Sequence, residues 1–190
     1  MQLAEPNVRR WTRAEYHQMA DLGWFEGQRA ELVEGEIVVL SPQKFTHAAT
    51  TDRVTEVLRD LLGGAFWVRM QLPIVLTDLS EPEPDVSIVP GRREDYSDHP
   101  RGASLVVEVS DTTVLFDRGK KLQMYAAAAI PEYWIVDLQA RAVEVRKRPV
   151  AGSGDVASPR YSDLQIYGGT DVIDIGLQTG ARVAVDQLLV

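Results

Sequence analysis

The sequence contains no cysteine, and this absence excludes two classes of site. Disulfide bonds cannot form, and a zinc or iron–sulfur site held by thiolates cannot be built. Any metal in this chain would be bound by carboxylate, carbonyl or imidazole groups. Because carboxylate oxygens are hard ligands, Mg²⁺ and Mn²⁺ are the ions that such a site would favour.

Positive charge is also scarce. The chain has 20 basic against 28 acidic residues, which gives a net charge of −8. A general nucleic-acid-binding protein usually carries a basic face, so this total weighs against that class. An enzyme that contacts nucleic acid locally is still compatible with it, because clustered acidic residues that bind a metal also lower the total charge.

No apolar run reaches the roughly 20 residues that a membrane-spanning helix needs. The polar start of the chain, Met1 to Trp11, also lacks the apolar stretch of a secretory signal. We therefore expect a cytoplasmic protein without a membrane partner. The 190 residues are 45% apolar and 25% charged, which is typical of a globular protein, and we expect one domain over residues 1–190 with its core at about 29–148.

Apolar periodicity and turn residues predict an order of helices and strands. Expected helices cover residues 12–22, 46–62 and 115–130, and a hairpin covers residues 30–40. Expected strands cover residues 66–76, 85–89, 105–110, 133–136 and 142–148. Residues 149–160 predict an exposed loop, and residues 161–190 predict two or three short strands and a turn.

Two rows of side chains follow the expected helix at residues 115–130. The row that we expect to be buried consists of Leu115, Leu122, Ala126 and Ala129. Because residues four apart share a helix face, a second row lies beside it, formed by Asp117, Lys121 and Tyr125. We expect this second row to border the sheet without being buried in it.

The expected strand at residues 105–110 carries a single charge, Glu108, in an otherwise apolar run. A carboxylate in such a strand is costly unless a cation neutralises it. The candidate cations are a metal ion and Lys121, whose helix follows the strand directly. If Lys121 alone is the partner, the two residues form a buried ion pair and no metal binds, and the residues by themselves leave both interpretations open.

A metal site would draw on two neighbouring strands. Asp85 begins one of them, Glu108 lies in the other, and the backbone carbonyl of Val109 could add a third oxygen. Oxygen ligands suit Mg²⁺ or Mn²⁺, which activate water and bind phosphate oxygens. Lys121 could then orient the attacking water. A glycosidase using the two carboxylates as a pair is another possible chemistry, but it gives Lys121 no role.

Four further polar residues are candidate accessory members of the site, namely Glu31, His47, Asp117 and Tyr125. Glu31 lies in a strand of the expected hairpin, where a solvent-facing side chain is the more common arrangement. His47 lies in the first turn of an expected helix, and a single histidine there is more often structural. Asp117 and Tyr125 lie four residues before and after Lys121.

Several motifs together resemble the Uma-two-type restriction endonucleases of the PD-(D/E)XK nuclease superfamily. The motifs are Pro84-Asp85, Glu108-Val109-Ser110, Asp117-Arg118 with Lys121-Leu122 and Tyr125-Ala126, and the run from Pro131 to Asp137. The segment from Glu31 to Glu36 and His47 resemble the N-terminal pattern of the same family. The likeness covers about residues 31–137, and its specific part runs from Glu108 to Asp137.

The resemblance implies an α/β (α+β) fold in which helices flank a mixed central sheet, with a restriction-endonuclease-like core and an N-terminal helix and hairpin. It also implies Mg²⁺-dependent cleavage of phosphodiester bonds in DNA, with Asp85 and Glu108 as metal ligands. Ser110 stands where the superfamily motif has lysine, and Lys121 on the next helix would take that role. The alternative is an inactive nuclease-like binding or accessory protein, in which Glu108 and Lys121 form a structural ion pair.

The sequence also predicts a homodimer. Apolar strands continue beyond the core at residues 133–136 and 161–175, and an unpaired sheet edge favours association with another chain. Two copies would also provide one cleavage site for each strand of a DNA duplex.

Overall fold

The computed structural model describes residues 8–152 and 158–190. Its helices are α1 (Arg13–Asp21), α2 (Phe45–Leu62), α3 (Val114–Phe116), α4 (Leu122–Ala127) and α5 (Val185–Leu188). Its strands are β1 (Arg29–Val33), β2 (Glu36–Leu40), β3 (Phe66–Met70), β4 (Val86–Pro90), β5 (Leu105–Ser110), β6 (Glu132–Asp137), β7 (Ala142–Val150), β8 (Arg160–Gly168), β9 (Val172–Asp174) and β10 (Arg182–Ala184). Short 3₁₀ turns are η1 (Gly63–Ala65) and η2 (Arg93–Asp95), and η3 (Asp117–Lys121) is a π-helical turn.

A six-stranded sheet forms the centre of the molecule, in the order β3-β4-β5-β6-β7-β8. The β5–β6 pair is parallel, and the other neighbouring pairs are antiparallel. Parallel strands need a long crossover, and α3, η3 and α4 provide it between β5 and β6. The sheet is therefore mixed, and the predicted α/β (α+β) class is confirmed.

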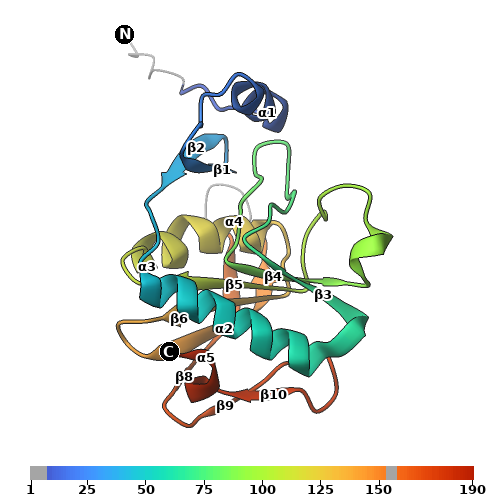
Figure 1. Ribbon diagram of the computed structural model, residues 1–190, viewed down its shortest axis with the longest axis vertical. Coiled ribbons are helices and arrows are strands. Elements are labelled where there is room, and N and C mark those ends of the chain that lie inside the picture. The colour runs from blue at the N-terminus through green and yellow to red at the C-terminus, as the bar shows by residue number, and fades with distance from the viewer. Residues whose placement is uncertain (1–7, 153–157) are drawn as a thin grey trace.

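Helices cover both faces of this sheet (Figure 1). Helix α2 crosses one face, and its residues Val54 and Leu58 pack with Val107 and Val109 of β5. The crossover helix α4 lies on the other face, where Val106 of β5 joins its apolar cluster. Because strand side chains alternate between faces, Glu108 points with Val106 toward the α4 side.

The N-terminal hairpin of β1 and β2 lies at one end of the sheet, together with α1 (Figure 1). The hairpin predicted at residues 30–40 is confirmed, and its turn lies at Glu34-Gly35, where both residues have positive φ, at 49° and 79°. Positive φ at two successive positions is the geometry of a tight hairpin turn. A Cβ at Gly35 would also lie 2.5 Å from the Cβ of Arg10, so this turn requires glycine there.

The predicted strand at residues 66–76 ends early, at Met70. Gln71 has a φ of 50°, which an extended strand does not contain. Strand β7, by contrast, is longer than predicted, because it continues past residue 148 to Val150. Strand β7 tolerates Pro149 because its pairing with β6 has already ended at Lys147, so Pro149 pairs only with β8.

The predicted continuous helix at residues 115–130 is wrong, because the π-helical turn η3 divides it and α4 ends at Ala127. A π turn inserts an extra residue into the helical repeat, so side chains before and after it do not share one row. Leu122 and Ala126 are buried as expected, but Leu115 is 83% exposed. Ala129 has a φ of 55° and lies outside the helix on an exposed corner.

Two predicted segments lie partly outside the described residues: the start of the chain up to Asn7, and residues 153–157 of the expected loop. Among the residues that are described, no helix is both long and apolar enough to cross a membrane.

Candidate active site

The pairing of β4 with β5 brings Asp85 and Glu108 together. Val86 pairs with Val107 in antiparallel register, so Asp85, the residue before β4, lies beside Glu108. The backbone N–H of Asp85 donates to Oε2 of Glu108 at 3.4 Å, and the N–H of Val109 donates to Oδ2 of Asp85 at 2.9 Å. Both side chains are buried, and two carboxylates therefore lie close together in a poorly hydrated region.

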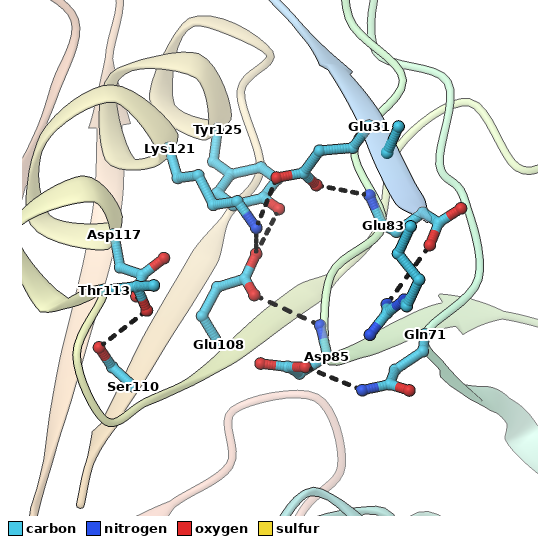
Figure 2. A network of polar contacts seen from close by, with 12 residues as sticks. Glu31, Gln71, Glu83, Asp85, Glu108, Ser110, Thr113, Asp117, Lys121 and Tyr125 are labelled. Carbon is cyan, nitrogen blue, oxygen red and sulfur yellow. Dashed lines mark hydrogen bonds and ion pairs between the residues drawn. The ribbon is translucent and has the colours of Figure 1, made fainter. Parts of the chain in front are cut away.

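The crossover places Lys121 and Tyr125 against Glu108. The ammonium of Lys121 donates to Oε1 of Glu108 at 3.0 Å, and the hydroxyl of Tyr125 donates to the same oxygen at 2.7 Å (Figure 2). The expected proximity of Lys121 to Glu108 is confirmed. The expectation that the row of Asp117, Lys121 and Tyr125 lies unburied at the sheet border is wrong, because all three are buried.

Glu31 enters the same cluster from the N-terminal hairpin. Its Oε1 lies 3.2 Å from the Lys121 ammonium as an ion pair, and its Oε2 accepts a 3.0 Å hydrogen bond from the backbone N–H of Glu83 (Figure 2). The interpretation of Glu31 as a solvent-facing strand residue is therefore wrong. The cause is long-range: Leu32 bridges to Glu81, and this contact docks the hairpin onto the loop that precedes Asp85.

His47 projects from the first turn of α2 toward Asp85, and its Nε2 lies 3.3 Å from Oδ2 of that residue. Burial lowers the pKa of His47, but Asp85 and the Val109 backbone outweigh burial and raise it above the ordinary value. Burial raises the pKa of the Asp85 carboxyl, but His47 and the Val109 N–H outweigh it and hold that pKa below its usual range. The two shifts agree, and they describe a charge-assisted pair.

Asp117 closes another side of the site. Its Oδ2 accepts a 2.8 Å hydrogen bond from the Thr113 hydroxyl, which in turn lies 3.4 Å from the hydroxyl of Ser110 (Figure 2). Burial raises the pKa of the Asp117 carboxyl, and the Lys121 ammonium opposes the rise. Ser110, at the motif position of a lysine, therefore contributes a hydroxyl to this hydrogen-bonded chain and no charge.

The buried acids share one ammonium, and their protonation reflects this. Burial raises the pKa of Glu108 to about 8, Lys121 opposes the rise, and Asp85 adds to it. Burial lowers the pKa of Lys121, but Glu108 and Glu31 outweigh burial and raise it above its ordinary value. Lys121 therefore stays charged, and it is the carboxyl side of the cluster that lacks compensating charge.

A cavity of about 370 Å³ opens onto these residues, lined among others by Asp85, Glu108, Val109, His47, Asp117 and Lys121. The sequence analysis missed other lining residues, including Arg29, Lys44, Glu83 and Asp111. Asp111 directly follows strand β5, and Glu83 lies between two prolines just before Asp85. Their positions beside these motifs were the sequence signal that could have identified them. Lys44 pairs with Asp111 at 2.7 Å, a long-range contact with no signal in the sequence.

Gln71 is a further residue that the sequence analysis missed. Its amide Nε2 donates to Oδ1 of Asp85 at 3.2 Å, and its positive φ turns the chain toward that carboxylate after β3 ends. Among the described residues, Oδ1 of Asp85 therefore has one partner, Gln71, whereas Oδ2 has two, the Val109 N–H and His47. A carboxylate oxygen has two lone pairs, so Oδ1 retains the capacity to bind a cation.

Metal binding would rely on Asp85 and Glu108 together with backbone or substrate oxygens. Over residues 8–152 and 158–190, no group of three or more histidine, aspartate and glutamate side chains is arranged to hold a metal by itself. Mg²⁺ is usually bound by one or two carboxylates and fills its remaining positions with water and phosphate oxygens. The donor set therefore fits Mg²⁺ or Mn²⁺ better than an ion that needs a complete protein cage.

We predict that His47 titrates above its ordinary pKa of 6.5 in metal-free protein, because Asp85 stabilises the imidazolium. NMR of the ring carbons would measure this, with the His47 signal identified by its loss in His47→Gln. Since the folded-state pKa is the higher one, the pair's contribution to the free energy of unfolding is complete below pH 6.5 and is lost as the pH rises through the pKa of folded His47. Asp85→Asn should lower the midpoint, and an unchanged midpoint would contradict the pairing.

Comparison with known proteins gives an independent view of this geometry. A solved structure described as a "putative nuclease belonging to DUF820" from Anabaena variabilis ATCC 29413 matches the fold with a TM-score of 0.69 at 13% sequence identity, covering 93% of this chain and 96% of that one. No curated protein matches the sequence. The family model Uma2, described as "Putative restriction endonuclease", matches residues 13–186. That span includes every residue of the buried site, and the chain belongs to the Uma2 family of restriction-endonuclease-like proteins.

Proposed function

We propose that this chain is a Mg²⁺- or Mn²⁺-dependent DNA endonuclease with Asp85 and Glu108 as metal ligands. The observation that carries the proposal is an imbalance of buried charge. Four carboxyl groups at the site are at most 7% exposed, those of Glu31, Asp85, Glu108 and Asp117. Among the described residues, two cationic groups face them: Lys121 pairs with Glu31 and Glu108, and His47 pairs with Asp85. Because an uncompensated buried carboxylate is costly, a divalent cation would stabilise this cluster.

The proposed ligand set uses the oxygens that protein donors leave free. Oε2 of Glu108 receives one long contact, the 3.4 Å N–H of Asp85, whereas Oε1 receives two shorter ones. The carbonyl of Val109 would be a further ligand at the same edge of β5. A bound Mg²⁺ or Mn²⁺ would supply charge for the phosphate and lower the pKa of a coordinated water.

The chain's own residues would do the remaining work. Lys121 places a permanent positive charge 3.0 Å from Glu108, where it offsets negative charge that develops on a phosphate in the transition state. Arg29 and Lys44 line the same cavity, and they would contact the phosphates of a DNA backbone. The acidic side chains that line the same cavity, those of Glu83, Asp85, Glu108, Asp111 and Asp117, outnumber these cations, so a bound metal ion would be required before a phosphate could approach.

A second candidate function rests on the Lys121–Glu108 hydrogen bond itself. That bond already provides Glu108 with a protein counter-ion, as expected for an inactive nuclease-like binding or accessory protein. In this case the site is structural and takes up no metal. Metal binding separates the two candidates, because only the nuclease requires it.

We expect wild-type protein to bind Mn²⁺ and Glu108→Gln to lose this binding, as measured by titration calorimetry. Glutamine has the volume of glutamate and keeps an oxygen for Tyr125 and Lys121, so circular dichroism should show an intact fold. Plasmid cleavage should be lost in parallel. Unchanged Mn²⁺ affinity in Glu108→Gln would reject the ligand assignment, and a wild-type protein that binds no Mn²⁺ would favour the inactive alternative.

The two neighbouring lysines should differ in effect. Lys121→Met removes the charge beside Glu108, so we expect plasmid cleavage to fall at least about 100-fold and the free energy of unfolding to fall by about 3–5 kcal/mol. Lys120→Met is the matched control, because Lys120 pairs with Glu36 on the hairpin, a half-exposed contact, and should change stability by less than about 1 kcal/mol. Equal effects of the two substitutions on cleavage and stability would contradict a specific role of Lys121 in the site.

We also propose that two copies associate through β8. This strand is the last of the central sheet and has nine residues, and it exposes the apolar side chains of Leu164 and Ile166. An edge strand of this length can pair with the same strand of a second copy. A dimer would present two cavities to one DNA duplex.

We expect sedimentation equilibrium at micromolar concentration to give twice the 21.1 kDa chain mass. Ile166→Lys should shift the protein toward the monomer, because it places a charge in the apolar edge. Leu22→Lys is the control, since Leu22 is also exposed but follows α1 at the other end of the molecule. Only monomer in the wild type, or equal effects of the two substitutions, would contradict the β8 dimer.

A further inference from the structure

The two oxygens of Glu108 have different surroundings. Oε1 accepts hydrogen bonds from the Tyr125 hydroxyl at 2.7 Å and from the Lys121 ammonium at 3.0 Å. Oε2 faces Asp85, and from the described part of the chain it receives only the 3.4 Å backbone N–H of that residue. Figure 2 shows the same division, with two donors on one side of the carboxylate and Asp85 on the other. The carboxylate is therefore held from one side and left available on the other.

Tyr125 is built rigidly into this position. Its side chain is fully buried in α4, and its ring lies 5.0 Å from the ring of Tyr133. The Tyr133 hydroxyl donates in turn to the backbone carbonyl of Asp117 at 3.1 Å. Burial and this ring contact hold the Tyr125 side chain in place, so its hydroxyl oxygen stays beside Glu108.

Lys121 cannot fix the orientation of Glu108 alone. Its ammonium is a compact charge with rotatable donors, and it divides its contacts between Glu31 and Glu108. The terminal torsion of a glutamate is broad and roughly two-fold, so one shared donor leaves the plane of the carboxylate able to rotate. A second donor in a fixed position holds that plane, and with it the direction of the other oxygen.

We propose that Tyr125 is a positioning residue, whose hydroxyl holds Oε1 of Glu108 so that Oε2 is presented, beside Asp85, as the metal-binding oxygen. The proposal rests on the proposed function, since it requires Glu108 to be a ligand. It assigns to Tyr125 no contact with metal or DNA. Groups that hydrogen-bond to a metal ligand commonly change metal affinity by about 10- to 100-fold when removed.

The test compares two deletions of a single hydroxyl. Tyr125→Phe removes the bond to Glu108, and we expect the Mn²⁺ dissociation constant, measured by calorimetry at constant pH, to rise about tenfold. Tyr133→Phe is the matched control: that tyrosine is equally buried in the same ring cluster, but its hydroxyl bonds a backbone carbonyl. Its Mn²⁺ affinity should stay within about twofold of the wild type, well short of the range for a group that bonds a ligand.

Infrared difference spectra provide a readout that a loss of stability would not move. Addition of Mn²⁺ shifts the carboxylate stretching bands, and we expect the shift to change in Tyr125→Phe and to match the wild type in Tyr133→Phe. Wild-type affinity and bands in Tyr125→Phe would overturn the positioning role, as would equal losses in both variants, which would indicate packing. If Mn²⁺ still binds to Glu108→Gln, or does not bind to the wild type, both the proposed function and this inference are contradicted.

Discussion

The buried ammonium of Lys121 is the contact on which the rest of the site depends. It lies 3.2 Å from Glu31 and 3.0 Å from Glu108, so one charge joins the N-terminal hairpin, the central strand β5 and the π-helical turn. No other ammonium or guanidinium among the described residues forms an ion pair with either carboxylate. Loss of that charge would leave two acids buried without compensation, which costs more than an ordinary surface ion pair contributes. The hairpin, β5 and the π-helical turn are thus held together through this residue.

The parts of the fold that depend on local pattern were predictable. Strand β5 lies at the expected residues 105–110, and α2 ends at the expected Leu62, directly before Gly63. The helix expected at residues 12–22 is found as α1, and Thr12 and Glu15, three residues apart, form a capping box at its start. The proximity of Glu108 and Lys121 was expected because a carboxylate in an apolar strand is costly unless a cation lies beside it. Metal binding by Glu108 remains a prediction.

The parts that depend on long-range contacts were not predictable. Glu31 looks like any acidic residue on a hairpin, and it is buried only because the hairpin docks on the loop before Asp85. The π turn at η3 has no pattern that distinguishes it from an ordinary helix, and it is the reason why Leu115 is exposed. The turn of the chain at Gln71 likewise depends on a hydrogen bond to the backbone of Asp85, 14 residues away in the sequence.

The origin of Glu31 in the N-terminal hairpin has a consequence for how the molecule assembles. The hairpin is made early in synthesis, but its buried carboxylate obtains a counter-charge only from a residue of the crossover that follows β5. Docking the hairpin before that crossover is in place would bury an acid alone, at a cost of several kcal/mol. The π-helical turn therefore stabilises the docked hairpin, and Glu31 has its counter-charge only when both elements are in place.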